Sequence, residues 1–392
     1  MLPFEGIRVL DLTHVFAGPF STFQLAVLGA EVIKIEPFDK PDMTRFEGPT
    51  EDHNLELMGL QYQAQNGGKK CMSLNLKSSE GQEILTRLII SSDVLVHNYS
   101  LNAAVRLGLT HERLKKVNPK VIFCSISGYG HTGPKAEHPA YDIVVQAYTG
   151  SMYANGTAQT APVRIGPAVI DYGTGSQTAF AIAGALFKRE KTQKGCSIDV
   201  AMSDCALMLM NFHTHFTLET GKPPAVIGNN DPMLAAYGCY EAATGLIMIG
   251  AFTNKQMARL MRILGNHKRA EEILNCPRSD IVKNYKEDRE YLMSEFLKFT
   301  AENLEEKLND HHIPAARVRT LDEALCEEQI TSRNILQKID GRTLTTAGFT
   351  YSDEPPTIKH APRTLAADNE IIMFELGYTA AEINGLRKKR VI

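Results

Sequence analysis

The sequence predicts an α/β protein with a large doubly wound, Rossmann-like domain and a smaller α+β domain. Three observations predict this fold class. Short apolar strands alternate with helical segments over the first 220 residues, which is typical of parallel sheets covered by helices. A stretch rich in helix and strand breakers, from Pro223-Pro224 to Pro232, then interrupts the alternation. The hairpin-like residues 237–251 and the mostly charged helical residues 254–308 follow it, which indicates a second domain.

The first elements form a βαβ unit. Residues 7–12 are a short apolar strand, and Gly18-Pro19 opens a helix that runs to Leu28, with the proline suited to a helix start. Gly29 ends this helix, and residues 31–35 are a second strand. Because a helix connects the two strands, we expect them to pair in parallel.

The alternation continues along the chain. Further strands are expected at residues 71–76, 93–97, 121–127, 163–170 and 197–201. Helices are expected at residues 79–90 and 174–189, and a long one near Ser203. Strand character returns at 313–318, and an amphipathic segment at 379–390 closes the chain. We therefore divide the chain into 1–220, the N-terminal part of the large domain, 221–325, the small domain, and 326–392, which returns to the large domain.

The composition excludes several classes of protein. Of 392 residues, 43% are hydrophobic and 22% charged, as in globular proteins. No secretory signal and no apolar run of membrane-spanning length is visible, so we expect a cytoplasmic protein without a membrane partner. The net charge of −3 gives no general attraction to nucleic acid. Seven scattered cysteines without a CxxC pair, and histidines without metal-site spacing, predict neither disulfides nor a metal.

The glycine-rich residues 128–133 match the GxGxxG pattern of dinucleotide-binding sites directly after a strand. The context does not support a nicotinamide site, because Pro139 would interrupt the helix that should follow. Asp142 also lies too close to bind a ribose. A glycine-rich turn is the better interpretation, and no nicotinamide cofactor is expected.

Asp171 is the candidate that carries chemistry. It follows the expected strand 163–170 and precedes a helix in which Thr174 and Gln177 have the spacing of a capping box. In open α/β sheets ligands bind beyond the carboxyl ends of strands, so a carboxylate here would face the crevice. On spacing alone, however, a turn or cap residue is the commoner role for an aspartate in this position.

A family resemblance favours the chemical role. Separated motifs occupy residues 8–19, 29–36, 127–134, 139–142 and 197–202. In this order they resemble those of the class III CoA-transferases, a family that includes formyl-CoA transferase, carnitine CoA-transferase and α-methylacyl-CoA racemases. The likeness extends from residue 1 to near the C-terminus.

The resemblance implies a catalytic aspartate at Asp171. It also implies a large domain built from both chain ends and an interlocked homodimer. In the racemase branch a histidine stands thirty positions before the aspartate, whereas this chain has Tyr141 there, and a phenol is a poor base at neutral pH. Tyr141 thus weakens the case for a CoA-ester racemase or epimerase, which is kept as the alternative function. Direct hydrolysis of an acyl-CoA is only weakly disfavoured.

The resemblance also indicates where coenzyme A would bind. The backbone around Val15, Phe16 and Ala17 is expected to contact it, and Lys77 and Arg106 are expected to meet its phosphates. The other expected contacts are Leu74, Asn75, Leu76, Asn98, Tyr99 and Ser100. The active site would be lined by Tyr141, Asp142, His14 and Phe16.

Two departures from formyl-CoA transferase bear on the substrate. Pro37 stands where that enzyme has an arginine near the adenine, and Lys40 is the cation closest in sequence to replace it. Phe16 stands in place of an active-site glutamine, which favours a more apolar acyl group than formyl or oxalyl. The expected partners are an acyl-CoA, a carboxylic acid and a second copy of the chain. A nicotinamide dehydrogenase and a CoA-sensing scaffold without chemistry stay open as competing functions.

Overall fold

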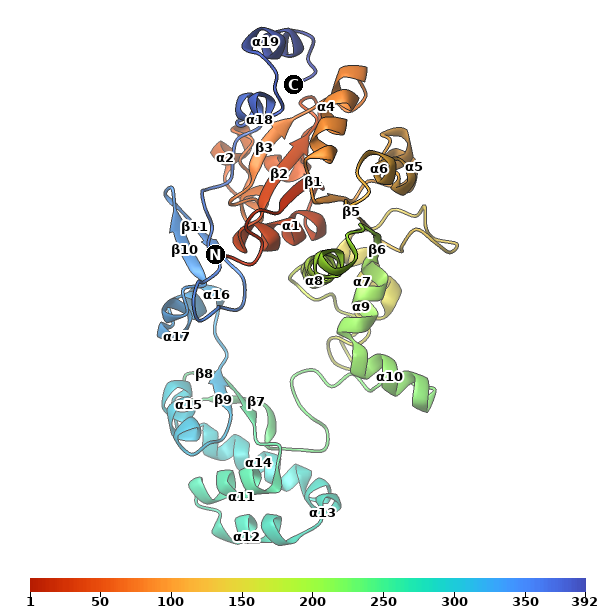
Figure 1. Cartoon of the computed structure of the whole chain (residues 1–392). Coiled ribbons are helices and arrows are strands. Elements are labelled where there is room, and N and C mark those ends of the chain that lie inside the picture. Colours follow the sequence, from red (N-terminus) through yellow and green to blue (C-terminus); the bar gives the residue numbers. More distant parts are fainter. The chain divides into compact units, whose positions relative to one another are not determined.

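A computed structural model describes residues 1–392, which form two compact units (Figure 1). Unit 1 contains Met1–Ser151, Arg164–Pro223 and Arg333–Ile392, and unit 2 contains Met152–Val163 and Pro224–Ser332. Both ends of the chain thus fold into unit 1. The segment Met152–Val163, which no sequence signal separated from its neighbours, joins unit 2.

A six-stranded parallel sheet forms the centre of unit 1, with the strand order β3-β2-β1-β4-β5-β6. The strands are β1 (Arg8–Leu12), β2 (Glu31–Glu36), β3 (Lys70–Ser73), β4 (Val94–His97), β5 (Ile122–Ser127) and β6 (Ser197–Ala201). The chain moves outward from β1 through β2 to β3, and then outward on the other side from β4 to β6. The direction changes between β1 and β4, which is where open α/β sheets bind ligands. The α/β class and the parallel sheet are confirmed.

Helices cover the sheet and carry its hydrophobic core. Helix α1 (Ala17–Val27) connects β1 to β2, and α4 (Ser79–Ile90), capped by the Ser78 hydroxyl, connects β3 to β4. Apolar clusters lie on both sheet faces: Leu10 and Leu95 belong to one, and Val9 and Val96 to the other. Because successive side chains of a strand point to opposite faces, β1 and β4 are buried on both sides.

The expectation of a strand at residues 163–170 is wrong. These residues are mostly exposed and pair with no strand of the sheet, and helix α8 (Val169–Thr192) begins five residues before the expected Thr174. The apolar run does not form a strand because Pro162 and Pro167 lack the backbone N–H groups that hydrogen bonds between strands require. The predicted capping box is therefore wrong too, since Thr174 lies inside the helix. The long helix expected near Ser203 is two helices, α9 (Met202–Leu209) and α10 (Asn211–Thr220).

Residues 128–141 contain no helix, and Gly130 and Gly133 have φ values of 80° and 85°. Such values favour glycine, so this segment is the glycine-rich turn that the sequence analysis preferred to a dinucleotide site. Helix α7 (Asp142–Thr149) begins only after it.

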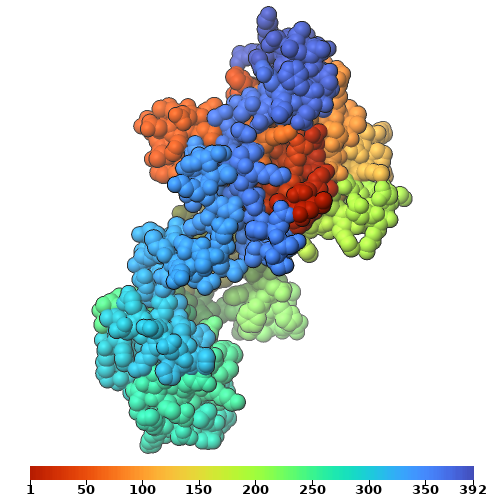
Figure 2. Space-filling view, turned by 60° about the vertical axis from the view of Figure 1, so that its left-hand side comes forward, coloured from red at the N-terminus to blue at the C-terminus, as the bar shows by residue number.

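The C-terminal segment packs against the N-terminal part of unit 1. The Cys71 N–H donates to Asp368 Oδ2 at 2.8 Å, and the Asn75 N–H donates to the carbonyl of Val391 at 2.8 Å. In Figure 2 the blue C-terminal residues accordingly run alongside the red and orange N-terminal ones. This segment forms the hairpin β10 (Leu336–Ile339) and β11 (Arg342–Thr345), and helices α18 (Asn369–Glu375) and α19 (Ala380–Lys388).

Unit 2 has its own core, built around an antiparallel sheet in the order β7-β8-β9. Its strands are β7 (Tyr237–Ala242), β8 (Gly245–Gly250) and β9 (Ala315–Arg317), so the expected hairpin and the later strand pair with one another. Helices α11 (Asn254–Ile263), α12 (His267–Asn275), α13 (Arg278–Lys283), α14 (Tyr285–Phe296) and α15 (Ala301–Asp310) lie between them in sequence. None of the chain's helices combines the length and apolar character that a membrane span needs.

Candidate active site

The predicted site residues of unit 1 follow the carboxyl ends of its strands. Residues 13–17 follow β1, residues 74–77 follow β3, and residues 98–100 follow β4. Because all six strands are parallel, these segments lie at one edge of the sheet, and the first and third flank the change of direction between β1 and β4. The fold therefore brings the segments expected to contact coenzyme A to a common edge.

Asp171 joins this edge through helix α1. It lies in the first turn of α8, only 8% of the residue is exposed, and the backbone N–H of Ala17 is near enough to its carboxylate to lower its pKa. Ala17 is the first residue of α1, so its N–H has no acceptor within the helix. The Asp171 carboxylate thus meets the positive end of α1 next to the carboxyl end of β1.

Burial raises the pKa of Asp171 to about 7, and the neighbouring carboxylate of Asp142 adds to the rise. The N–H of Ala17 acts in the opposite direction, because it stabilises the ionised form. A carboxylate that is weakly solvated and ionises near neutral pH is a better nucleophile than an ordinary exposed one.

Asp142 caps the helix that carries Asp171. Its Oδ2 accepts the N–H groups of Ile170 at 2.8 Å and of Asp171 at 3.1 Å, while its Oδ1 accepts from Gln146 at 2.5 Å. The residue at the N-cap itself, Ala168, offers no side-chain acceptor. Asp142 therefore fixes the first turn of α8 from a neighbouring helix and keeps a second negative charge beside Asp171. Asp142 was expected to line the site, but nothing in the sequence indicates this capping role.

Helices α1 and α8 approach each other closely beside the carboxylate. A side-chain carbon at Gly175 would stand 2.7 Å from the carbonyl oxygen of Ala17 and 2.9 Å from the ring of Phe20. Only glycine leaves room for this contact. The close approach brings Ala17 within hydrogen-bonding reach of Asp171, which precedes Gly175 by one helical turn.

An aromatic group stands next to Asp171. The Tyr172 ring packs edge-on against Phe20, with centroids 4.9 Å apart, and lies 6.1 Å from the ring of Phe16. Burial and the Asp171 charge raise the pKa of Tyr172, so this phenol stays neutral. Tyr172 was not among the predicted site residues, although its place beside Asp171 in sequence could have suggested it.

His14 is held by its backbone. Its N–H donates to Asn98 Oδ1 at 3.0 Å and its carbonyl accepts from Asn98 Nδ2 at 2.8 Å, while its ring lies 5.5 Å from that of Tyr99. Burial lowers the pKa of His14, so the ring is neutral at pH 7. Two segments expected to contact the ligand, after β1 and after β4, are thereby joined directly.

The remaining predicted residues differ in exposure. Leu74 and Leu76 are buried, Asn75 is half-buried, and Ser100 is exposed and caps helix α5 (Leu101–Arg106). Tyr141 is 59% exposed and precedes α7, and no contact joins its ring to Asp171.

Three cations at this edge form no ion pair within the chain. Lys77 follows β3, Arg106 ends α5, and Lys40 follows β2 by four residues; all three are exposed. By contrast, Lys34, Arg45 and Lys69 are buried and paired with Asp42, Glu36 and Asp11. The unpaired cations are therefore the ones available to an anionic ligand.

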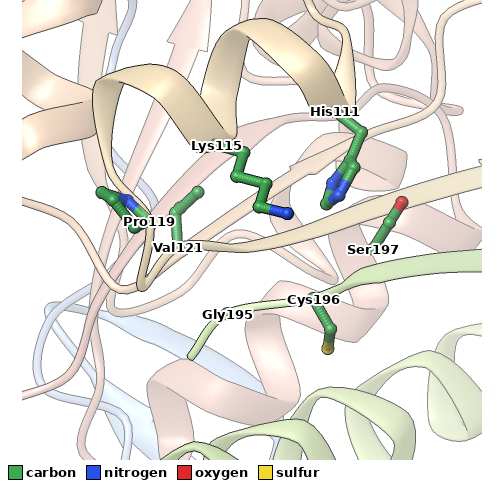
Figure 3. Close-up of a pocket in the computed structure, with 7 residues that line it drawn as sticks. All are labelled: His111, Lys115, Pro119, Val121, Gly195, Cys196 and Ser197. Carbon is green, nitrogen blue, oxygen red and sulfur yellow. The ribbon is translucent and has the colours of Figure 1, made fainter. Parts of the chain in front are cut away.

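A separate pocket of about 260 Å³ lies at the opposite, amino-terminal ends of β5 and β6 (Figure 3). His111 and Lys115 of helix α6 (His111–Val117) reach over it beside Ser197, while the thiol of Cys196 points away from them. This pocket shares no residue with the predicted site. The side chains in the structure also form no cluster of three metal-ligating residues.

The chain is similar over most of its length to known proteins. Residues 4–369 match the family described as CoA-transferase family III. The chain is 32% identical to the succinate–glutarate CoA-transferase of Agrobacterium fabrum over 87% of both chains, and 34% identical to the acetyl-CoA:oxalate CoA-transferase of Acetobacter aceti over 86% of both. It is 30% identical to the formyl-CoA:oxalate CoA-transferase of Streptomyces coelicolor over 99% of this chain and 98% of that protein.

A solved structure has the same fold. The crystal structure of a CAIB/BAIF family protein from Brucella suis superposes with a TM-score of 0.85 at 30% identity, covering 96% of this chain and 99% of the other.

Proposed function

The chain belongs to CoA-transferase family III and is an enzyme of that class, and we propose that it transfers coenzyme A from an acyl-CoA to a carboxylic acid through covalent intermediates on Asp171. The observation that carries the proposal is the buried Asp171 carboxyl, which lies beside the first amide of α1 at the carboxyl edge of the sheet. A carboxylate is the only catalytic side chain that the exchange requires.

The proposed reaction proceeds in four substitutions. An Asp171 carboxylate oxygen attacks the thioester carbonyl, which forms a mixed anhydride and releases the CoA thiolate. The thiolate attacks the aspartyl carbonyl, which forms an aspartyl-CoA thioester and frees the donor acid with one aspartyl oxygen. The acceptor carboxylate then displaces the thiolate to form a second anhydride. Finally the thiolate attacks the acceptor carbonyl, so acceptor-CoA leaves and the Asp171 carboxylate is restored.

The amide of Ala17 has a specific part in this sequence. It donates to the ionised carboxylate before attack, and each tetrahedral intermediate on the aspartyl carbon places negative charge on an oxygen of the same group. The positive end of α1 therefore favours both species. Asp142 fixes the turn that aims the carboxylate, and its negative charge raises the pKa of Asp171.

Coenzyme A is proposed to lie along the carboxyl edge, with Lys77 and Arg106 as phosphate partners and Lys40 as a further cation. The proposed backbone contacts are residues 15–17, 74–76 and 98–100. Unpaired surface cations at one edge fit a ligand with several phosphate charges.

The acyl group is proposed to be apolar next to the thioester carbon. Phe16, Phe20 and Tyr172 provide an aromatic wall beside Asp171, and no cation contributes to the environment of that carboxylate. A carboxylate placed directly next to the thioester carbon, as in an oxalyl group, would meet the charges of Asp142 and Asp171 without compensation. Tyr141 and His14 are proposed to line the remainder of the site.

A homodimer is the proposed assembly, with unit 1 as the CoA-binding part. Large apolar side chains are exposed on two helices of unit 1. Phe180 and Phe187 on α8 are 73% and 65% exposed, and Phe212 on α10 is 68% exposed. The chain exposes 20,514 Å², whereas two separate compact bodies of the size of its units would expose about 18,000 Å². A second copy is the partner that would cover such a surface.

Replacement of Asp171 by Ala tests the proposal. The expected result is loss of transfer of labelled CoA between acids, with binding of CoA largely retained, because the cations and backbone contacts remain. Asp204→Ala is the matched control, since Asp204 also lies in the first turn of a helix, α9, but is exposed. Transfer by the Asp171→Ala variant at the rate of the control would refute the assignment.

A second measurement separates the transferase from a CoA-ester racemase. A racemase would exchange the α-hydrogen of its substrate with deuterium from the solvent, which the four substitutions never require. Deuterium uptake by the recovered acyl-CoA without labelled CoA exchange would favour the racemase.

A further inference from the structure

Side chains bind the backbone N–H and carbonyl groups of Thr13, His14 and Val15, which lie between β1 and α1. The N–H of Thr13 donates to Asp11 at 2.9 Å, and its carbonyl accepts from Lys34 at 2.8 Å. Both groups of His14 bind Asn98. The N–H of Val15 donates to Asp42 at 3.2 Å, and its carbonyl accepts from Gln65 at 2.9 Å. Since this segment forms no ladder and no helix, its conformation is set entirely by these side chains.

Val15 shows why such a clamp is needed. Its φ is 70°, in the left-handed region that a β-branched residue adopts only under strain. A backbone strained in this way persists only where its surroundings hold it. Asp42 and Gln65 bind the two sides of this residue, one on its N–H and the other on its carbonyl.

Both clamping residues are themselves fixed in the core. Asp42 is 4% exposed and its second oxygen lies 3.1 Å from Nζ of the buried Lys34. Gln65 is fully buried; its Nε2 donates to the carbonyls of Val15 and Gln61, while its Oε1 has no partner. An unpaired amide oxygen in the interior lowers the stability of the folded state. The contribution of Gln65 therefore comes from the hydrogen bonds that its Nε2 donates.

Ala17 follows Val15 by two residues. We infer that Asp42 and Gln65 are positioning residues: by holding Val15 in its left-handed conformation, they direct the N–H of Ala17 at the carboxylate of Asp171. The inference rests on the proposed role of Asp171 as the nucleophile. It adds two residues that touch neither substrate nor carboxylate, and it assigns a purpose to part of the buried ion-pair network around β1 and β2.

The test uses the pH dependence of transfer, because the N–H of Ala17 favours the ionised form of Asp171. The titratable groups that act on Asp171 are Asp142 on α7 and the adjacent Tyr172. Gln65→Met keeps the side-chain volume and adds no charge, but it releases the Val15 carbonyl. Asp42→Ala releases the Val15 N–H, and Asp42→Asn keeps an oxygen that can accept it.

Gln65→Met and Asp42→Ala should move the rising limb of kcat/KM to higher pH by about half a unit to one unit. At pH 6 the loss of activity should then reach about ten-fold, and it should shrink toward pH 9. Asp42→Asn should restore part of the shift. Asp288→Ala is the control, because Asp288 is a buried aspartate paired with Arg269 in unit 2 and should lower stability without moving the limb.

A merely structural role would lower activity equally at all pH values. If Asp42→Ala does not fold, the pH dependence of Gln65→Met alone tests the inference, because this substitution leaves no unpaired charge. The Asp171 carboxyl can also be titrated by ¹³C NMR in the resting enzyme, which keeps the inference testable even if transfer itself is absent. A titration and a rising limb of Gln65→Met that both coincide with wild type would overturn the inference.

Discussion

At the scale of the residue, Asp171 is a carboxyl group under opposing influences. Burial and the charge of Asp142 favour the protonated form, and the amide of Ala17 favours the ionised form. The resulting pKa of about 7 leaves a substantial fraction ionised at neutral pH while solvation stays weak. This balance suits a group that must attack a thioester and later act as a leaving group.

The same balance makes stability depend on pH. The pKa of Asp171 rises from 3.8 to about 7 on folding, so between these values the native state binds more protons than the unfolded state. Stability must therefore fall as pH rises through this window. We expect the free energy of unfolding of Asp171→Asn to exceed that of wild type at pH 8 by up to about 4 kcal/mol. Near pH 4 the two free energies should be equal.

Urea unfolding at the two pH values measures this difference. Asp204→Asn, at an exposed first-turn position, should show no such pH dependence. An Asp171→Asn variant that is no more stable than wild type at pH 8 would show that the carboxylate is better solvated than its burial indicates.

At the scale of the element, the contact between α1 and α8 brings Ala17 to Asp171, and Gly175 makes that contact possible. Gly175→Ala should destabilise the protein by about 1–3 kcal/mol, because the added carbon would stand 2.7 Å from a backbone oxygen. Activity should fall with it, since relief of the clash moves Ala17 away from the carboxylate.

Gly184→Ala on the same helix is the matched control. A carbon there meets no atom within 4 Å, so this variant should gain about 1 kcal/mol from helix propensity and keep its activity. Thermal melting and transfer assays of both variants check the pair, and equal effects on stability would contradict the account of the contact.

At the scale of the whole molecule, the exposed aromatic residues on α8 are the surface where we propose that a second copy binds. Phe180 lines an apolar groove of about 510 Å³ that also includes Phe349 from the C-terminal segment. Phe180→Asp would bury an unpaired charge in that interface, so we expect it to lower the sedimenting mass toward 43.4 kDa.

Ile90→Asp is the control for the dimer. Ile90 is 61% exposed at the end of α4 and does not line the groove, so this variant should sediment as wild type does. A wild-type chain that sediments as a monomer would contradict the proposed assembly.

The parallel sheet was predictable because each of its strands can be recognised from its own residues. Strands such as Val94–His97 are continuous apolar runs, and Ser78 marks the start of α4 by local capping chemistry. The run at residues 163–170 carried the same signal without the buried neighbours that make a strand, so the prediction failed there.

The sequence suggested which residues belong to the candidate site but not the contacts that hold them. Asp171 and the segments at the carboxyl edge came from a family likeness, whereas the capping of α8 by Asp142 joins residues 28 and 29 positions apart. The clamp on Val15 joins elements up to 50 residues apart. Such contacts depend on how the helices pack, which no local pattern encodes.

The central claim is that Asp171 carries the acyl group and coenzyme A covalently, and isotope transfer tests it most directly. A single turnover with an acceptor acid labelled with ¹⁸O should leave one labelled oxygen in the Asp171 carboxyl, because that oxygen bridges the second anhydride. Mass spectrometry of the peptide that contains Asp171 would then show the heavier residue. Complete turnover with an unlabelled Asp171, or with the label on another side chain, would contradict the account.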